Sequence, residues 1–254
     1  MITLVIGPGY TGSRVLERLP AASAIALGRS LEGREHLDLD SDAATIDLPG
    51  RYSIIFTVPP SADRASRSAP TGLATNRWSG SRTATATEPD RASRSAPTDA
   101  RLASLLARCA DVPQRFVYLS TTGVYGNRDA ALVDETSEPH PESVQAQRRL
   151  AAETLLQDWS RERGTTPIIL RVPGIYGPGR LGLDRIRAGT PVLDEEDANP
   201  GNRIHVDDLV TCCIAALSPD VPGGVYNVGD GDTRSTTWFT NEVARQATLP
   251  PPPT

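Results

Sequence analysis

Three glycines near the start of the chain have the spacing G-x-G-x-x-G, in the segment Gly7-Pro8-Gly9-Tyr10-Thr11-Gly12. The segment follows an apolar run, residues 2–6, and opens a stretch with helical periodicity, which is the context that this motif requires. In such a loop the first glycine permits a tight turn, the second lets a diphosphate approach the backbone, and the third allows close helix–strand packing. The start of the helix then faces the phosphates. The pattern predicts a dinucleotide site formed by Gly7, Gly9, Tyr10, Thr11 and Gly12, with a glycine-rich turn that binds nothing as the alternative.

A second candidate contact lies at the end of the next predicted strand. NAD-binding proteins usually place an acid there, about 20 residues further on, for the ribose 2′-hydroxyl. This chain reads Leu27-Gly28-Arg29-Ser30 instead. A guanidinium suits a 2′-phosphate, so Arg29 predicts NADP in preference to NAD, unless it is an ordinary surface arginine. Asp38 could face the adenine, although a turn-forming aspartate is an equally good interpretation.

Composition and charge exclude several other chemistries. All 26 residues in the Lys+Arg total are arginines, so no lysine is available for a Schiff base or for the phosphate loop of nucleoside triphosphatases. The net charge of −5 gives no basic field for nucleic acid, and the apolar runs are too short to cross a membrane. The three histidines lack the spacing of a metal site, and the three cysteines are interpreted as core thiols. The amino terminus has no leader pattern, which predicts a cytoplasmic protein.

Short apolar runs alternate with helical patterns, as is typical of βαβ units around a parallel sheet. The predicted fold class is α/β: a Rossmann-type, doubly wound parallel sheet with a small C-terminal substrate lobe. We expect the dinucleotide-binding domain over residues 1–173 and the lobe over 174–254. Strands are predicted at residues 2–6, 23–27, 36–39, 53–58, 116–120, 168–172 and 225–228, and helices at 13–19, 100–109, 143–162, 207–217 and 237–247.

One tract, residues 61–98, does not fit this alternation. The nonapeptide DRASRSAPT occurs in it twice, at residues 63–71 and 90–98. Few large apolar residues are present, so the tract cannot bury enough surface to offset the entropy of ordering it. It is interpreted as a duplicated, disordered insertion. A basic segment covering a phosphorylated ligand is the alternative.

Five later motifs extend the pattern. They are Ser120-Thr121-Thr122-Gly123-Val124-Tyr125-Gly126, Val133-Asp134-Glu135, Leu170-Arg171-Val172-Pro173-Gly174-Ile175-Tyr176-Gly177-Pro178-Gly179, Ile204-His205-Val206-Asp207-Asp208-Leu209 and Tyr226-Asn227-Val228-Gly229. In this order they resemble the extended short-chain dehydrogenases/reductases, the NAD(P)-dependent epimerase/dehydratase family. The resemblance covers the chain from residue 2 to about residue 230, apart from the insertion. It implies an oxidoreductase or epimerase that acts on a nucleotide sugar or another small carbonyl compound.

The chain departs from the family at the catalytic pair, Tyr-x-x-x-Lys, which precedes a run found here as Leu150-Ala151-Ala152-Glu153. Counting back from this run places Gln145 and Arg149 at the tyrosine and lysine positions. Glutamine has no titratable proton to give to a carbonyl, whereas arginine can still bind ribose hydroxyls. The resemblance gives Thr121 the role of the hydroxyl that bonds the substrate oxygen, with a strand-end threonine as the alternative. In this the chain is similar to atypical members, in which an aspartate replaces an active-site asparagine; Asp99 is the match.

Two functions therefore stay open. The first is an NAD(P)-dependent enzyme with an impaired proton relay and a small-molecule substrate. The second is a catalytically inactive NADP-binding sensor or scaffold. A homodimer is left open as an assembly. The family usually continues beyond a point like Thr254, which leaves open whether the lobe is complete.

Further residues carry weaker expectations. Arg171 and Arg180 could hold a substrate phosphate or an interface acid. Tyr125 and Tyr176 match tyrosines that the family carries besides its catalytic one. His205 and Asp207 belong to a structural corner in the resemblance, and Asp207 is expected to cap a helix that starts at Asp208.

Overall fold

The computed structural model describes residues 1–28, 39, 51–59 and 99–254. Six strands of this part form one sheet, in the order β2-β1-β3-β4-β5-β8, and every neighbouring pair is parallel. The strands are β1 (Ile2–Ile6), β2 (Ala24–Leu27), β3 (Tyr52–Phe56), β4 (Arg115–Thr121), β5 (Thr166–Val172) and β8 (Gly224–Asn227). The order reverses at β1, which has β2 on one side and β3 on the other. In parallel sheets of this kind, ligands bind at such a reversal, beyond the carboxyl ends of the strands.

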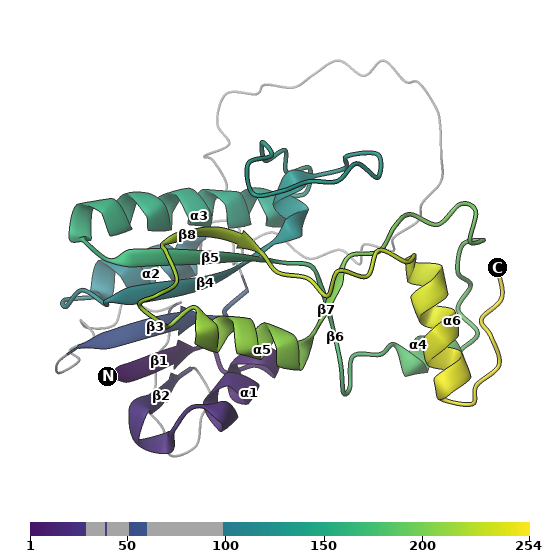
Figure 1. Cartoon of the computed structure of the whole chain (residues 1–254), viewed down its shortest axis with the longest axis horizontal. Helices are drawn as coiled ribbons and strands as arrows, with labels where there is room; N and C mark the ends of the chain where they lie inside the picture. Colours follow the sequence, from purple (N-terminus) through teal and green to yellow (C-terminus); the bar gives the residue numbers. More distant parts are fainter. Residues whose placement is uncertain (29–38, 40–50, 60–98) are drawn as a thin grey trace, which may run out of the picture.

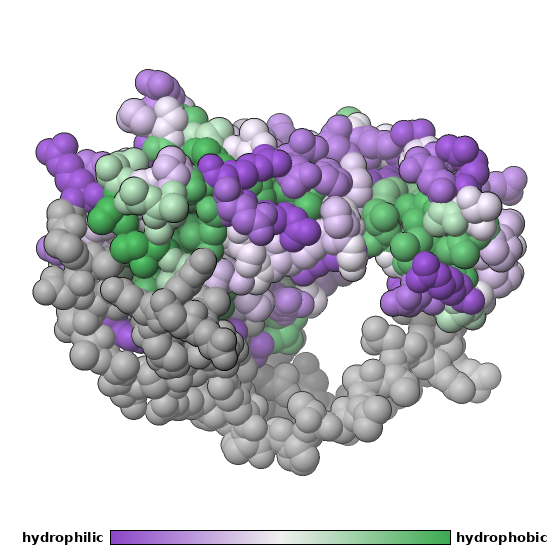
Figure 2. Space-filling model, turned by 90° about the horizontal axis from the view of Figure 1, so that it is seen from below, coloured by the Kyte–Doolittle hydropathy of each residue, from purple (hydrophilic) through white to green (hydrophobic). Residues whose placement is uncertain are grey.

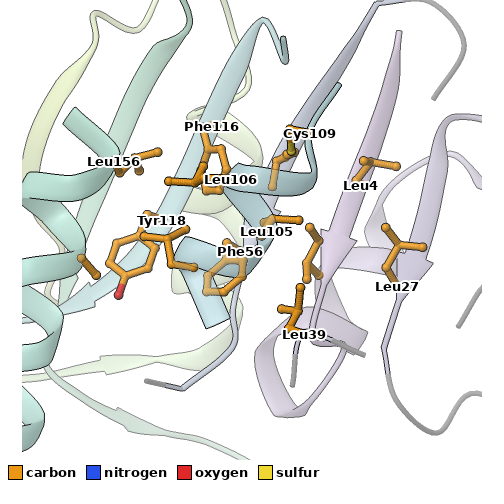
Figure 3. Close-up of a cluster of buried hydrophobic side chains, with 14 of the residues drawn as sticks. Leu4, Leu27, Leu39, Phe56, Leu105, Leu106, Cys109, Phe116, Tyr118 and Leu156 are labelled. Atoms are coloured by element: carbon orange, nitrogen blue, oxygen red, sulfur yellow. The ribbon is translucent and has the colours of Figure 1, made fainter. Parts of the chain in front are cut away.

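Helices cover both faces of the sheet, which confirms the doubly wound prediction (Figure 1). They are α1 (Tyr10–Arg18) and α5 (Val206–Ala215) on one face, and α2 (Ala100–Arg108) and α3 (Val144–Arg163) on the other. Side chains of β1 alternate between the two cores, because successive strand residues point to opposite faces. Leu4 packs in the cluster with Phe56 and Leu156, which Figure 3 shows in close-up, whereas Val5 packs with Val15 on the α1 side.

A smaller lobe lies beyond the carboxyl ends of the strands (Figure 1). It contains a two-stranded parallel sheet, β6 (Gly174–Tyr176) and β7 (Arg203–His205), and the helices α4 (Leu183–Arg187) and α6 (Thr236–Gln246). Ile186 and Phe239 belong to its small apolar cluster. In the space-filling view, hydrophobic residues gather over α4 and α6 with hydrophilic residues around them (Figure 2).

The structure differs from the predicted division at residue 173. Helix α5 and strand β8 follow that point in the chain, yet both belong to the main sheet. Strand β8 pairs with residues Ile168–Arg171 of β5, and α5 packs against α1. The free edge of β5 would otherwise leave backbone groups without partners, and β8 satisfies them. The lobe is therefore built from two separate stretches of chain.

Most predicted elements are present with boundaries shifted by a few residues. The first helix begins at Tyr10 rather than at residue 13, because Gly9 already accepts a helical hydrogen bond from the Ser13 amide. Arg29, Asp38 and the insertion lie outside the described residues, as does the predicted strand at 36–39 except for its last residue. Two of the cysteines, Cys109 and Cys213, are buried, and Cys212 is half-buried.

The expected capping role of Asp207 is wrong. Helix α5 begins at Val206, one residue after its N-cap, His205. The His205 Nδ1 atom accepts a hydrogen bond from the Asp207 amide at 3.2 Å. The Asp207 carboxylate instead lies 3.4 Å from an Arg18 Nη atom of α1. The Asp207 carboxylate therefore links α5 to α1. This contact could not be predicted from local sequence, because Arg18 and Asp207 are 189 residues apart.

Candidate cofactor-binding site

The three glycines of the first loop are required for three different physical reasons. Gly7 has φ +80°, and a Cβ built on it would lie 2.5 Å from Cγ2 of Val58. A Cβ on Gly12 would lie 2.9 Å from Thr57 Oγ1 and 3.0 Å from the Gly7 carbonyl oxygen. Gly9 is different: among the described residues, its chain neighbours aside, a Cβ on it would have only the Gly7 oxygen within 4 Å, at 3.9 Å. The backbone at Gly9 is therefore open to the space above the sheet, as a close ligand would need.

The start of α1 carries an uncompensated partial positive charge. Its N-cap, Gly9, has no side chain to accept from the first amides, and the first turn contains no acid. The first four amides of a helix have no acceptor within the helix, so this end attracts an anion. The Thr57 hydroxyl, at the end of β3, donates to the carbonyl of Gly7 and fixes the turn in place.

A cavity of about 370 Å³ lies in front of this helix start. It sits at the carboxyl ends of β1, β3, β4 and β5, where the strand order reverses. The described residues of its lining include two guanidinium groups and no carboxylate. The lining residues are Gly7, Gly9, Tyr10, Thr11, Thr57, Pro59, Leu119, Ser120, Arg149, Val172, Ile175 and Arg180. Such a lining suits an anionic ligand with apolar parts.

Arg149 is held at the cavity by a buried tyrosine. Its Nη1 atom donates to the Tyr118 hydroxyl at 3.0 Å and to the Val58 carbonyl at 3.3 Å. The Tyr118 hydroxyl lies 3.4 Å from Oδ2 of Asp99, whose Oδ1 caps α2. Burial raises the pKa of Tyr118; Arg149 opposes this rise and Asp99 adds to it. The Tyr118 hydroxyl therefore positions the Arg149 guanidinium at the cavity.

Neither Thr121 nor Gln145 is among the described residues that line this cavity. Thr121 is the N-cap of a short 3₁₀ turn, η3 (Thr122–Tyr125), and its Oγ1 accepts from the Gly123 amide at 3.1 Å. That turn packs on the start of α3, because a Cβ on Gly123 would lie 3.9 Å from the Cβ of Ala146. Gln145 is exposed in the first turn of α3.

A buried polar network joins four of the sequence motifs behind the cavity. Arg171 Nη2 lies 2.8 Å from Oε2 of Glu153, and these side chains are only 6% and 3% exposed. Ser120, which lines the cavity, donates its hydroxyl to the same carboxylate. Arg171 also donates to the Tyr125 hydroxyl at 2.9 Å, and that hydroxyl donates to Asn227 Oδ1 at 2.8 Å.

This network changes the expectations for two residues. Arg171 is held by a buried partner, and of the two arginines considered for a phosphate, Arg180 and not Arg171 is among the described residues that line the cofactor cavity. Tyr125 likewise uses its hydroxyl inside the network. Local sequence carried no sign that Glu153 would be the acceptor at the centre of this network. Its only signal was that it ends the run Leu150-Ala151-Ala152-Glu153, from which the position of Arg149 follows.

Tyr176 lies in the lobe, away from the cofactor cavity. Its ring packs edge-on against His205 at 5.2 Å and against Phe239 at 5.3 Å. It lines a second cavity, of about 500 Å³, together with Arg203 and Trp238. Burial raises the pKa of Tyr176, with a further rise from a nearby aspartate.

Neither a metal-binding cluster nor a membrane-spanning helix is found in the described part of the chain. Among the described residues, no group of three or more acidic, histidine or cysteine side chains gathers where a metal ion could be held. Within the same part of the chain, the helices lack the length and apolar character needed to span a bilayer.

Comparison with known proteins gives relatives of several activities. Protein YeeZ of Escherichia coli K12 is 32% identical over 139 residues, which cover 54% of this chain and 48% of that protein. A human dTDP-D-glucose 4,6-dehydratase is 25% identical over 138 residues, or 39% of its length. The chain thus spans less than half the length of these curated relatives.

Solved structures share the fold over nearly the whole chain. A functionally unknown conserved protein from Silicibacter pomeroyi DSS has a TM-score of 0.69 at 26% identity, over 99% of this chain and 80% of that one. The UDP-glucose 4-epimerase of Thermus thermophilus, solved with NAD, also has a TM-score of 0.69, at 21% identity over 100% and 86% of the two chains. Residues 3–229 match the family model, and the chain therefore belongs to the NAD dependent epimerase/dehydratase family.

Proposed function

We propose that this chain binds a nicotinamide dinucleotide in the cavity above Gly9 and acts on a nucleotide sugar or another small carbonyl compound. The observation that carries the proposal is the cavity itself. Among the described residues, it combines the open backbone at Gly9, a start of α1 without a side-chain cap, and two guanidiniums, and no carboxylate lines it. A dinucleotide diphosphate is the anion that this fold family places at such a helix start.

The residues present fit such a ligand. The first-turn amides of α1 would hold the phosphates, and Arg149 would bind ribose hydroxyls, since its guanidinium is positioned by Tyr118. When bound, the nicotinamide supplies hydride donation and acceptance. NADP is proposed over NAD on the strength of Arg29. The support for this preference is the place of Arg29 in the sequence, shortly after β2.

The substrate side rests on Thr121. Its hydroxyl oxygen already accepts from the Gly123 amide, which leaves its hydrogen to donate. Within the described part of the chain, no acceptor takes that hydrogen. We assign this hydroxyl the bond to a substrate carbonyl oxygen, in keeping with the family match. The relatives named above, a dehydratase and an epimerase of nucleotide sugars, support a substrate of this class.

Slow turnover is part of the proposal. Gln145, at the position of the family's tyrosine, has no titratable proton to transfer to a carbonyl. Loss of a general acid–base group typically costs about 10²–10⁴ in rate. A water molecule or another acid would have to supply the proton.

The same exposed Gln145 favours a second candidate function, cofactor binding without turnover. The two candidates are separated by one set of measurements. NADPH and NADH are titrated against the protein by their own fluorescence. UDP-glucose is then added as the probe substrate together with NADP+ or NAD+, because its hydroxyl carbon must first give hydride to an oxidised cofactor. Epimerised sugar is followed by NMR, and net cofactor reduction is followed by absorbance.

Saturable binding with conversion supports the enzyme, and saturable binding without conversion supports the binding protein. Failure of both cofactors to bind would overturn both. Thr121→Val should lower conversion and leave cofactor binding unchanged. Thr122→Val, at the neighbouring position, is the matched control and should lower neither.

A further inference from the structure

A tight turn in the lobe presents an arginine to the cofactor cavity. The turn is Gly177-Pro178-Gly179-Arg180, and the Arg180 amide donates to the Gly177 carbonyl at 2.9 Å. Proline at the second position and a glycine with φ +78° at the third are the features of a type II turn. The fixed backbone of such a turn sets where the following side chain begins.

Tyr10 of the glycine-rich loop anchors this turn. Its hydroxyl donates to the Pro178 carbonyl at 2.9 Å, across 168 residues of sequence. A Cβ on Gly177 would lie 2.9 Å from the Tyr10 hydroxyl and 2.8 Å from Cγ1 of Val206. Only glycine allows the turn to approach so closely. The lobe is thus docked on the same loop that borders the cofactor cavity.

Two guanidiniums lie on the ring of Tyr10. The Arg14 Cζ is 4.1 Å from the ring centroid and the Arg180 Cζ is 4.0 Å from it. Arg14 also donates to the Tyr10 carbonyl at 2.9 Å. Arg180, by contrast, has no carboxylate partner within the described residues, and it lines the cofactor cavity. A charged group so placed has donors left for an anionic ligand.

The cavity offers one place for that anion. The start of α1 lies on one wall and Arg180 comes from the lobe, so a diphosphate between them would meet amides and a guanidinium together. We propose that Arg180 is a diphosphate ligand of the bound dinucleotide, contributed by the lobe and held by Tyr10. This inference rests on the proposed cofactor binding. It adds that the lobe takes part in holding the cofactor.

The experiment measures binding by isothermal titration with five probes: ADP, AMP, UDP, NADPH and NADH. Arg180→Gln removes the charge, and Arg187→Gln makes the same change on an exposed residue of α4 paired with Asp184. We expect Arg180→Gln to weaken ADP and NADPH binding by about 10- to 100-fold, the effect of one charge-assisted contact, and AMP binding much less. Arg187→Gln should bind all probes like the unmodified protein. Arg180→Lys, which keeps the charge but not the forked donors, should recover part of the affinity.

Three outcomes are distinguishable from success. If the unmodified protein binds neither NADPH nor NADH, the proposed function fails. If it binds the dinucleotide and Arg180→Gln binds it equally well, the inference about Arg180 is overturned while the proposed function stands. If Arg180→Gln weakens UDP binding and leaves ADP binding intact, the arginine serves the substrate's diphosphate, and the assignment to the cofactor is wrong.

Discussion

Alanine at Gly9 should separate cofactor binding from folding. Within the part of the chain that the structure describes, the added methyl group meets nothing nearer than the Gly7 oxygen at 3.9 Å, and Gly9 has φ −83°, which alanine adopts without strain. Alanine is a poorer N-cap than glycine, by up to about 1 kcal/mol, but it lowers the entropy of the unfolded chain by a similar amount. The free energy of unfolding should therefore change by less than about 1 kcal/mol, which is about 2–4 °C in Tm for a chain of this length.

Binding should respond much more strongly. The methyl group points into the open space where a phosphate oxygen would approach the α1 amides. Loss of one hydrogen bond to a charged group is worth about 1.5–3 kcal/mol, so the Kd for NADPH should rise about 10- to 150-fold. Thermal unfolding and a fluorescence titration of NADPH on the same sample measure both effects.

Gly7, two residues earlier, supplies the contrast. A methyl group there lies 2.5 Å from Val58 on a backbone with φ +80°. The left-handed backbone costs about 1–2 kcal/mol and the overpacking about 1–3 kcal/mol, so Gly7→Ala should lower Tm by about 4 °C or more. If folded Gly9→Ala binds NADPH as tightly as the unmodified protein, no phosphate approaches that backbone, and the reasoning about the loop is refuted.

Three other predictions concern the core, cofactor choice and catalysis. Glu153→Leu should lower the free energy of unfolding in urea by about 3–5 kcal/mol, because it leaves Arg171 buried without its partner. NADPH should bind about tenfold or more tightly than NADH, and Arg29→Ala should remove the difference; equal Kd values in the unmodified protein would contradict the NADP prediction. The double change Gln145→Tyr with Arg149→Lys should raise turnover of UDP-glucose, because it restores a phenol whose pKa a neighbouring ammonium can lower. No gain in a folded double variant that still binds NADPH would count against the family alignment of these positions.

The buried ion pair has an internal control. Arg161 and Asp158 form an ion pair at 3.0 Å on the outer face of α3, where the side chains are 75% and 55% exposed. Asp158→Asn should change the free energy of unfolding by less than about 1 kcal/mol, as is usual for exposed pairs. If Glu153→Leu lowers the free energy of unfolding no more than Asp158→Asn does, burial of the Glu153–Arg171 pair does not make it more important for stability than an exposed pair.

The glycine loop and the main sheet could be predicted from local sequence patterns. Each central strand is a continuous apolar run because both of its faces are covered, and the glycine spacing describes one turn, residues 7–12. Gly7 and Gly12 show in the structure the steric reasons that the motif predicts. The short strands β6 and β7 were missed, because three residues are too few to show any periodicity.

The groups around the cavity were decided by the tertiary structure. Arg171 and Glu153 are 18 residues apart and Tyr10 and Pro178 are 168 apart, so the contacts that fix their roles join different elements and lie outside any local motif. Sequence identified both arginines at residues 171 and 180 as equal candidates for a phosphate. The fold buries Arg171 against the Glu153 carboxylate and places Arg180 at the cofactor cavity. The surroundings of each arginine depend on which strands and helices pack beside it, and those elements are distant in sequence. Residue type and spacing thus determined what chemistry the chain can offer, and packing across distant segments determined which of those groups is free to offer it.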